Sequence, residues 1–386
     1  MHGRAHAGCQ IAILGSGLVC ALAPVPAFCL QTLQCYDETS LRMTSPLISV
    51  LIVVRNGSQD IIGALDSIAQ QDYSPLEVLV VDGLSDDNTK ALAAEYAARH
   101  PNFALRVLDN PGRIQASGWN VGIRAASGNY ILRLDGVHCR LERGYIHRCL
   151  EELLRMQQTD ATVAATGGRR MSVTRTDNPW SEAIALAQCS RFGVGNATYR
   201  LGTQSGFTDT LGVPLYNRDI LFKVGLFNEA LGRSEDNELH ARLRQQGYKL
   251  YFLADAVALY HPRTSLPEVA HQMFHNGWWV SATIVRLRSF PFGIRHLVPF
   301  LFWLILLVSG ALSPIYFFPR VLFCSLLACY LLASLAAAIQ ALPARGAWRI
   351  AVVFWCMHAS YAAGTAAGFF PRTNEILSAQ SAQAKQ

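Results

Sequence analysis

Short apolar runs alternate with segments of helical periodicity between residues 46 and 136, and this alternation leaves few folds open. Residues 47–54 (LISVLIVV) and 76–83 (LEVLVVDG) are continuous apolar runs of strand length. Residues 58–71 and 86–100, which follow them, have helical spacing. Strands that are apolar on both faces and alternate with helices form a mainly parallel sheet covered by helices. We therefore predict an α/β fold for this part of the chain.

The C-terminal third holds three apolar stretches, residues 296–318, 321–342 and 350–370. Each supplies the roughly 20 apolar residues that a membrane-spanning helix requires. The hydrophobic content of 51% also exceeds what a purely soluble enzyme usually carries. We therefore expect three transmembrane helices within residues 296–371.

Basic residues around these stretches predict their orientation. Arg286, Arg288 and Arg295 precede the first stretch, and Arg345 and Arg349 lie between the second and the third. Cytoplasmic loops carry an excess of Lys and Arg, so the large N-terminal part is expected in the cytoplasm.

The segment before the first apolar stretch, residues 268–289, has the pattern of an amphipathic helix. Its neighbouring tryptophans, Trp278 and Trp279, are typical of a membrane interface. We expect the segment to lie along the membrane surface.

The N-terminus is open to several interpretations. Residues 9–33 are uncharged and could form a signal sequence or a further span, but they contain Gly, Pro and three of the ten cysteines. Met43 lies just before the first strand, so residues 1–42 could also be an upstream extension that the working protein lacks. The expected organisation is an extension (1–45), an α/β domain (46–265), an interface helix (266–295), three spans (296–371) and a polar tail (372–386).

Charge and cysteine usage exclude some classes of protein. The net charge of +6 comes without a basic run, so a nucleic-acid partner is not expected. The cysteines form no CxxC pair, which argues against a zinc site and for a reducing compartment.

Polar residues follow the predicted strands, where open parallel sheets bind ligands. Arg55 follows the first strand, Asp82 ends the second, and Asp135 ends the apolar run at 129–136. A single aspartate there can simply cap a helix or close a turn. Together they could instead hold a nucleotide, with Asp135 supplying a hard oxygen ligand to a divalent cation on its phosphates.

A pair of acids, Glu235 and Asp236, opens the predicted helix 236–246. Ser234 and the two acids could act only as a helix cap, worth about 0.5–2 kcal/mol. A carboxylate there could also act as a general base, and both roles are compatible.

Four segments taken together resemble the family 2 glycosyltransferases with the GT-A fold. They are SVLIVVRN, EVLVVDGLSDDNT, NPGRIQASGWNVGIRAASGNYILRLDG and EDNELHARLRQQGYKL, in the order and spacing of that family. The resemblance covers roughly residues 46–290 and is nearest to the membrane-bound glucosyltransferases of succinoglycan-type exopolysaccharide assembly. It implies a GT-A sheet that binds a nucleotide-sugar donor.

The resemblance also implies roles for single residues on the donor side. Arg55, Asp82 and Arg113 match positions that contact the base and ribose. Asp135 matches the first acid of the DxD-type motif, which binds the donor diphosphate and Mg²⁺ or Mn²⁺. The second acid would fall at Val137, so His138 is the expected second metal ligand.

On the acceptor side, Asp236 matches the catalytic base, with Glu235 beside it. The implied activity is an inverting transfer of a hexose, expected to be glucose from UDP-glucose, to a lipid-linked saccharide at the cytoplasmic face of the bacterial inner membrane. Other polysaccharide-assembly proteins are candidate partners. A polyprenyl-phosphate sugar synthase and a catalytically inactive sugar-binding assembly subunit remain alternatives.

Overall fold

The computed structural model describes residues 12–13, 18–19, 45–174, 176, 178–341 and 346–370. Strands β1 (Ala12–Ile13) and β2 (Leu18–Val19) pair with each other in a separate N-terminal unit. The proposed upstream extension otherwise lies outside the described residues, as does the polar tail. The second and larger unit begins at Pro46.

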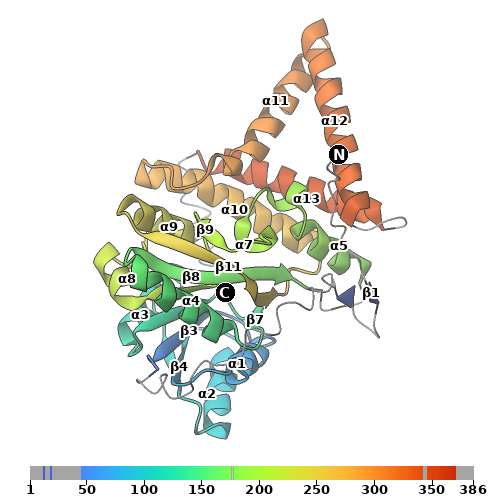
Figure 1. The fold of residues 1–386 in the computed structure, drawn as a ribbon. Coiled ribbons are helices and arrows are strands. Elements are labelled where there is room, and N and C mark those ends of the chain that lie inside the picture. Colours follow the sequence, from blue (N-terminus) through green and yellow to red (C-terminus); the bar gives the residue numbers. More distant parts are fainter. Residues whose placement is uncertain are drawn as a thin grey trace, which may run out of the picture. The chain divides into compact units, whose positions relative to one another are not determined.

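One sheet organises this larger unit (Figure 1). Its strands, as far as the chain is described, are β3 (Ile48–Val54), β4 (Leu76–Asp82), β5 (Leu105–Asp109), β6 (Tyr130–Leu134), β7 (Cys139–Leu141), β8 (Val163–Ser172), β9 (Gly206–Thr208), β10 (Pro214–Asn217) and β11 (Lys249–Tyr260). The spatial order is β5-β4-β3-β6-β10-β8-β11-β7, with β9 paired to β11. The predicted α/β fold is confirmed.

The sheet is mixed, because β10 in its centre and β7 and β9 beside β11 run against their neighbours. Strands β5, β4, β3 and β6 are parallel, and β8 is parallel to β11. Strand β10 is antiparallel to both β6 and β8, with Leu215 opposite Leu132 and Thr166. The continuous apolar runs of β3 and β4 are buried, as strands covered on both faces should be.

Helices cover both faces of the sheet. They are α1 (Ile61–Ala69), α2 (Thr89–Arg99), α3 (Gln115–Ala125), α4 (Tyr145–Thr159), α5 (Pro179–Gln188), α6 (Arg191–Val194), α7 (Thr198–Leu201), α8 (Arg218–Val224) and α9 (Glu235–Gln245). Helices α1, α2 and α4 contribute to one buried apolar cluster. Helices α3, α8 and α9 contribute to a second cluster, which includes Trp119 and Leu239. The site-bearing helix α9 is thus fixed by its apolar side.

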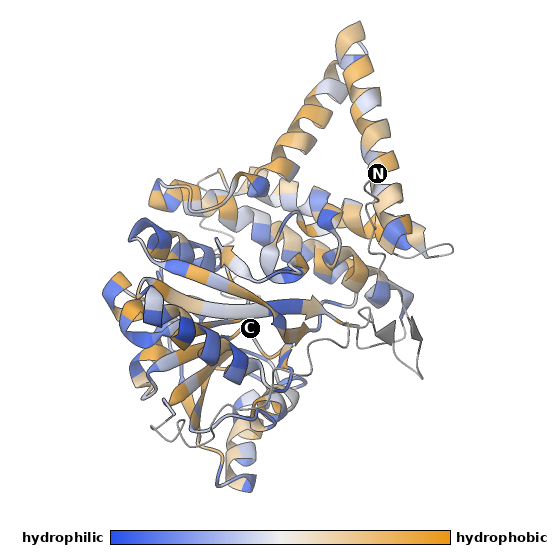
Figure 2. Ribbon diagram, viewed as in Figure 1, coloured by the Kyte–Doolittle hydropathy of each residue, from blue (hydrophilic) through white to orange (hydrophobic). Residues whose placement is uncertain are grey.

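The C-terminal part contains α10 (Leu266–Leu287), a short 3-10 turn η3 (Ile294–His296), α11 (Val298–Leu312), α12 (Phe317–Ala341) and α13 (Ala347–Ala367). Helices α10 and α13 lie side by side, and α11 and α12 project away from them as a hairpin (Figure 1). Hydrophobic residues dominate both helices of the hairpin (Figure 2).

Within the described residues, two helices rather than three are long and apolar enough to cross a membrane, Phe317–Ala341 and Ala347–Ala367. The expected first span is wrong in length, since α11 has only 15 residues. At 1.5 Å per residue it reaches about 22 Å, less than the roughly 30 Å of a bilayer core. The helix ends at Leu312, two residues before Pro314, which has no backbone N–H to continue the helical hydrogen bonding.

The interface-helix prediction also needs correction. Trp278 and Trp279 of α10 are 0% and 3% exposed, so they do not face lipid headgroups. They pack with Leu231 and Ala282 in a buried cluster. Helix α10 is therefore a packing element between the α/β domain and α13.

Close packing of α10 against α13 depends on two glycines. A Cβ at Gly364 would overlap the carbonyl oxygen of Phe274, and a Cβ at Gly277 would overlap that of Tyr361. Glycine at both positions lets the two backbones approach, as small residues do at helix–helix contacts in membranes.

Substituting Gly364→Val should separate α13 from α10. We expect the free energy of unfolding to fall by roughly 1–3 kcal/mol, the usual cost of overpacking. Thermal unfolding in detergent would measure this. Ala363→Val is the matched control, because Ala363 is exposed on the same helix. Equal unfolding temperatures for the two variants would contradict the proposed contact.

Candidate active site

The carboxyl ends of β4, β3 and β6 bring Asp82, Arg55 and Asp135 to one edge of the sheet. Asp82 is the last residue of β4 and is paired with Val54 of β3. On the other side of β3, Leu134 is paired with Ile52, so Asp135 follows at the same edge. Neighbouring strands lie about 4.8 Å apart, so two strand spacings, roughly 10 Å, separate the strands bearing these aspartates.

The first group at this edge consists of Asp82, Arg55 and Arg113. The buried Asp82 carboxylate accepts hydrogen bonds from the Ser85 backbone N–H (2.9 Å) and hydroxyl (2.5 Å). Arg55 donates to Asp86 at 3.2 Å. A Cβ placed on Gly83 would lie 3.2 Å from the Cβ of Arg55 and 3.5 Å from the carbonyl oxygen of Arg113, so this loop joins the residues closely.

The backbone at this edge is held in an unusual conformation. Asn56, Leu84 and Arg113, which follow β3, β4 and β5, have φ values of 53°, 56° and 58°. Ser234, just before α9, has φ 62°. Left-handed backbone is uncommon for residues other than glycine and tends to gather at binding sites, where the surrounding structure enforces it. Four such residues therefore mark the loops around one region.

The second group is built on Arg133, a buried residue of β6. Its Nη2 lies 3.3 Å from Oδ2 of Asp236 and 3.6 Å from Oδ1 of Asp135. The guanidinium also lies over the Trp119 ring, 5.5 Å from its centroid. One cation thus connects the aspartate after β6 with an aspartate about 100 residues later, so two of the four predicted site acids, Asp135 and Asp236, lie in one place.

The charges of this group depend on each other. Burial alone would raise the pKa of the Asp236 carboxyl, but the Arg133 guanidinium, together with His240 and the Asn237 backbone N–H, outweighs burial and holds this pKa below its ordinary value. Burial opposes the charge of Arg133 as well, yet Asp236 and Asp135 raise the pKa of Arg133 above its ordinary value. Asp236 is therefore an ionised carboxylate at neutral pH, able to accept a proton.

Asp135 has a second cationic neighbour, Arg170 of β8. The Arg170 Nη1 forms an ion pair with Asp135 Oδ2. The same guanidinium lies over the rings of Tyr199 (5.1 Å) and Tyr260 (4.7 Å). Two arginines and two aromatic rings therefore orient the Asp135 carboxylate.

The two acids at the start of α9 differ in exposure. Glu235 is 4% exposed, whereas 29% of the Asp236 side-chain surface is exposed. Within the described structure the Ser234 side chain forms no capping hydrogen bond with the helix. The simple cap interpretation is thereby weakened, although acids in the first turn still favour the helix dipole.

His138 lies against α1 rather than against a second site acid. Its Nδ1 is 2.7 Å from Oδ2 of Asp60, the residue before α1. A carboxylate on one ring nitrogen is the arrangement that orients histidines for metal binding.

The donor types present here fit a divalent cation with few protein ligands. Among the described residues, no group of three or more His, Cys, Asp or Glu side chains is arranged to hold a metal ion. Mg²⁺ and Mn²⁺ at phosphate sites take one or two carboxylates and complete their shell with phosphate and water. The Asp135 carboxylate and the His138 imidazole match that smaller requirement.

Three residues of the site were not anticipated from the sequence. Arg133 and Arg170 bind Asp135, and Asp60 binds His138. The signal for Arg133 was present, because a charged residue inside the apolar run YILRL needs a buried partner. Arg170 and Asp60 carry no comparable signal, since their roles depend on tertiary contacts.

Comparison with known proteins identifies the kind of domain that carries this site. Residues 49–221 match the family model described as glycosyl transferase family 2. The succinoglycan biosynthesis protein ExoA of Rhizobium meliloti is 26% identical over 68% of this chain and 77% of its own length. A dolichyl N-acetyl-α-D-glucosaminyl phosphate 3-β-D-2,3-diacetamido-2,3-dideoxy-β-D-glucuronosyltransferase of Methanococcus voltae is 26% identical over 70% of this chain and 84% of its own.

A solved structure has the same architecture. The mannosyltransferase PcManGT from Pyrobaculum calidifontis, determined in complex with GDP-Man and Mn²⁺, superposes with a TM-score of 0.58 at 20% sequence identity. The match covers 85% of this chain and 88% of that protein. Together with the family match, this likeness confirms the GT-A fold that the sequence motifs predicted. Residues 49–221 are therefore a glycosyl transferase family 2 domain, within a chain that is similar to glycosyltransferases over about two thirds of its length.

Proposed function

We propose that this enzyme transfers a hexose, glucose from UDP-glucose, with inversion to a hydroxyl group of a lipid-linked saccharide in exopolysaccharide biosynthesis. The observation that carries the proposal is the Arg133 guanidinium between Asp135 and Asp236. It supports a site in which one carboxylate serves the donor and another serves the acceptor. The similarity to a succinoglycan biosynthesis protein supports the polysaccharide pathway.

Asp236 is the proposed general base. Inverting transfer requires the acceptor hydroxyl to lose its proton as its oxygen attacks the anomeric carbon. Asp236 is ionised and partly exposed at the start of α9, so it can take that proton. Glu235, buried beside it, is the proposed positioning residue for this turn of the helix.

Donor binding is assigned to the first group of residues. Asp82 would accept hydrogen bonds from the base or ribose, as the resemblance to the family implies. Arg55 and Arg113 would contact the nucleotide from the loops after β3 and before α3. The shared left-handed backbone of these loops supports a preformed binding surface.

Asp135 and His138 are the proposed ligands of Mg²⁺ or Mn²⁺. When bound, the cation would neutralise the negative charge that develops on the departing diphosphate. Arg133 and Arg170 hold the Asp135 carboxylate in place, and Asp60 orients the His138 ring. The Mn²⁺ in the similar mannosyltransferase structure supports this assignment.

The proposed location is the cytoplasmic face of a bacterial inner membrane, with a multi-pass C-terminal anchor. Helices α12 and α13 are long and apolar enough to cross, and α11 completes a hairpin with α12. The proposed organisation is therefore the catalytic domain of residues 46–265, the helix within 266–295 and the anchor within 296–371. Such an anchor would hold the enzyme beside a lipid-linked acceptor and other polysaccharide-assembly proteins.

Substituting Asp236→Asn should lower kcat about 10²–10⁴-fold, the usual contribution of a general base, and leave UDP affinity unchanged. Transfer to a lipid-linked acceptor would be measured, with Asp219→Asn of α8 as an exposed control outside the site. A weak loss would instead favour a polyprenyl-phosphate acceptor, which needs little base assistance. No transfer or donor hydrolysis by the unsubstituted enzyme would favour an inactive sugar-binding subunit.

Substituting Arg133→Met should move the acid limb of the kcat/KM–pH profile to higher pH. Burial raises the pKa of Asp236 and Arg133 lowers it, so removing the cation leaves only His240 and the Asn237 backbone N–H to oppose burial, and the pKa rises. An opposite charge at this distance is worth about 1–3 pH units. Arg133→Lys keeps the charge and should restore much of the profile. An unchanged acid limb in a folded Arg133→Met variant would refute the coupling.

Replacing Asp82 by Asn should weaken UDP binding roughly 10- to 100-fold, as expected for the loss of a hydrogen bond to a charged group. Calorimetric titration with UDP in the presence of Mn²⁺ would measure the effect. Asp109→Asn is the control, because Asp109 ends the neighbouring strand β5 but pairs with Lys90. Equal UDP affinities for the two variants would show that Asp82 does not bind the donor nucleotide.

A further inference from the structure

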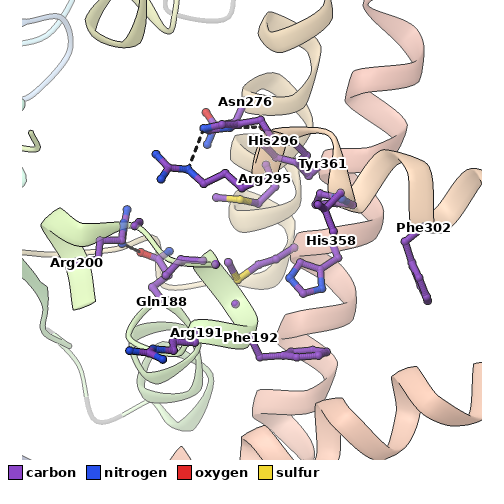
Figure 3. Close-up of a pocket in the computed structure, with 18 of the residues that line it drawn as sticks. Gln188, Arg191, Phe192, Arg200, Asn276, Arg295, His296, Phe302, His358 and Tyr361 are labelled. Atoms are coloured by element: carbon purple, nitrogen blue, oxygen red, sulfur yellow. Dashed lines mark hydrogen bonds between the residues drawn. The ribbon is translucent and has the colours of Figure 1, made fainter. Parts of the chain in front are cut away.

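A cavity of about 540 Å³ lies between the α/β domain and the C-terminal helices. Figure 3 shows Gln188, Arg191 and Arg200 on its domain side and His358 and Phe302 on its helical side. The lining comes from α5, α6, α7 and α9 on one side and from α10, η3, α11, α12 and α13 on the other. The cavity therefore joins the enzyme domain to the apolar helices.

The polar end of this cavity is cationic. Arg191, Arg200 and Arg295 line it, and His296 beside Arg295 is uncharged at neutral pH because burial lowers its pKa to about 4. The described residues of the lining include no carboxylate. A concave site lined by one sign of charge attracts a ligand of the opposite sign, so this end suits an anion.

Two of these arginines are held in position mainly by neutral groups. Arg200 Nη1 donates to Gln188 Oε1 at 3.1 Å and to Ser172 Oγ at 3.4 Å. Arg295 Nε donates to His296 Nε2 at 3.4 Å, and its Nη2 has one acidic neighbour, Asp209, at 3.6 Å. Their positive charge is thus only partly compensated within the described protein.

The opposite end of the cavity is aromatic. Phe302 and Trp303 of α11 and Phe192 of α6 surround Tyr330 of α12, with ring centroids 5.1, 6.2 and 5.5 Å from the tyrosine ring. Three of these four residues belong to the apolar hairpin α11–α12. A ligand that fills both ends must therefore combine an anionic head with a hydrocarbon tail.

The cavity also reaches the proposed base. Asn237 lines it, and its backbone N–H and side-chain amide donate to Asp236 Oδ1 at 2.7 and 3.1 Å. A group attached to a head held in the cavity would consequently lie near Asp236.

We propose that this cavity binds the phosphate-bearing head of a polyprenyl-type acceptor lipid, with Arg200 and Arg295 contacting the phosphate oxygens and the α11–α12 aromatic residues contacting the lipid. Arg191 lies at the same end and adds to the positive field. This inference rests on the proposed function, since it specifies how the acceptor is recognised. An ordinary bilayer phospholipid matches the charge but carries no saccharide to present to Asp236.

Equilibrium binding of undecaprenyl diphosphate to the purified full-length chain, measured by native mass spectrometry without donor, tests the proposal. Arg200→Gln and Arg295→Gln should each weaken binding about tenfold, as loss of a charge-assisted hydrogen bond does. Arg349→Gln is the control, because Arg349 lies on α13 over Trp348 and outside the cavity. Undecaprenol lacks the phosphate and so loses both contacts; it should bind the unsubstituted protein about 100-fold more weakly and be insensitive to these variants.

Three further ligands separate the alternatives. Equally tight, arginine-dependent binding of phosphatidylglycerol would make the cavity a general lipid site and overturn the proposal. Equally tight binding of inorganic pyrophosphate would show that the hydrocarbon tail contributes nothing to binding, which would also overturn the proposal. UDP affinity should stay unchanged in both variants, and a loss of UDP affinity would reassign the arginines to the donor. Because catalysis is not measured, normal lipid binding by an enzyme that transfers no sugar would refute only the proposed function.

Thermal unfolding of each variant shows whether it is folded. If one arginine variant unfolds, substituting Phe302→Ala at the aromatic end provides a second test. It should weaken undecaprenyl diphosphate binding while leaving pyrophosphate binding unchanged. Unchanged lipid binding would contradict the placement of the tail.

Discussion

The buried guanidinium of Arg133 is the interaction on which the site depends. It comes from the middle of the sheet and contacts both Asp135, after β6, and Asp236, on α9. Without a buried cation these carboxylates would repel each other and resist burial. With it, both carboxylates contact one guanidinium nitrogen, so an acid from the parallel half of the sheet and an acid from a later helix lie in one place.

The rest of the molecule holds this arrangement rigid. Leu239 and Leu243 anchor α9 in the apolar cluster under the sheet, and Trp119 of α3 lies beside the Arg133 guanidinium. Arg170, between two tyrosine rings, fixes Asp135 from the other side. On the opposite flank, α10 and α13 meet through Gly277 and Gly364, which fixes the apolar helices next to the catalytic domain. The proposed acceptor cavity is a consequence of that junction.

Much of the fold could be predicted from the sequence, and the failures have identifiable causes. Apolar runs ending in Asp82 and Asp135 predict strands and their shared edge, because the period of the pattern follows directly from backbone geometry. Arg133 was missed because its meaning depends on Asp236, far away in the chain. The hydropathy pattern overestimated the length of α11, because it counts apolar residues and ignores the helix-breaking effect of Pro314. Trp278 and Trp279 suit a membrane interface by composition, but only tertiary packing shows that they are buried.

The most direct measurement of the central claim is an experimental structure of the full-length enzyme with a non-hydrolysable UDP-sugar and Mn²⁺, with the metal located by anomalous scattering. We predict Mn²⁺ at about 2.1–2.2 Å from an Asp135 carboxylate oxygen, with the uracil and ribose against Asp82 and the anomeric carbon facing Asp236. A metal and diphosphate bound away from Asp135, with Asp236 turned from the sugar, would contradict this arrangement.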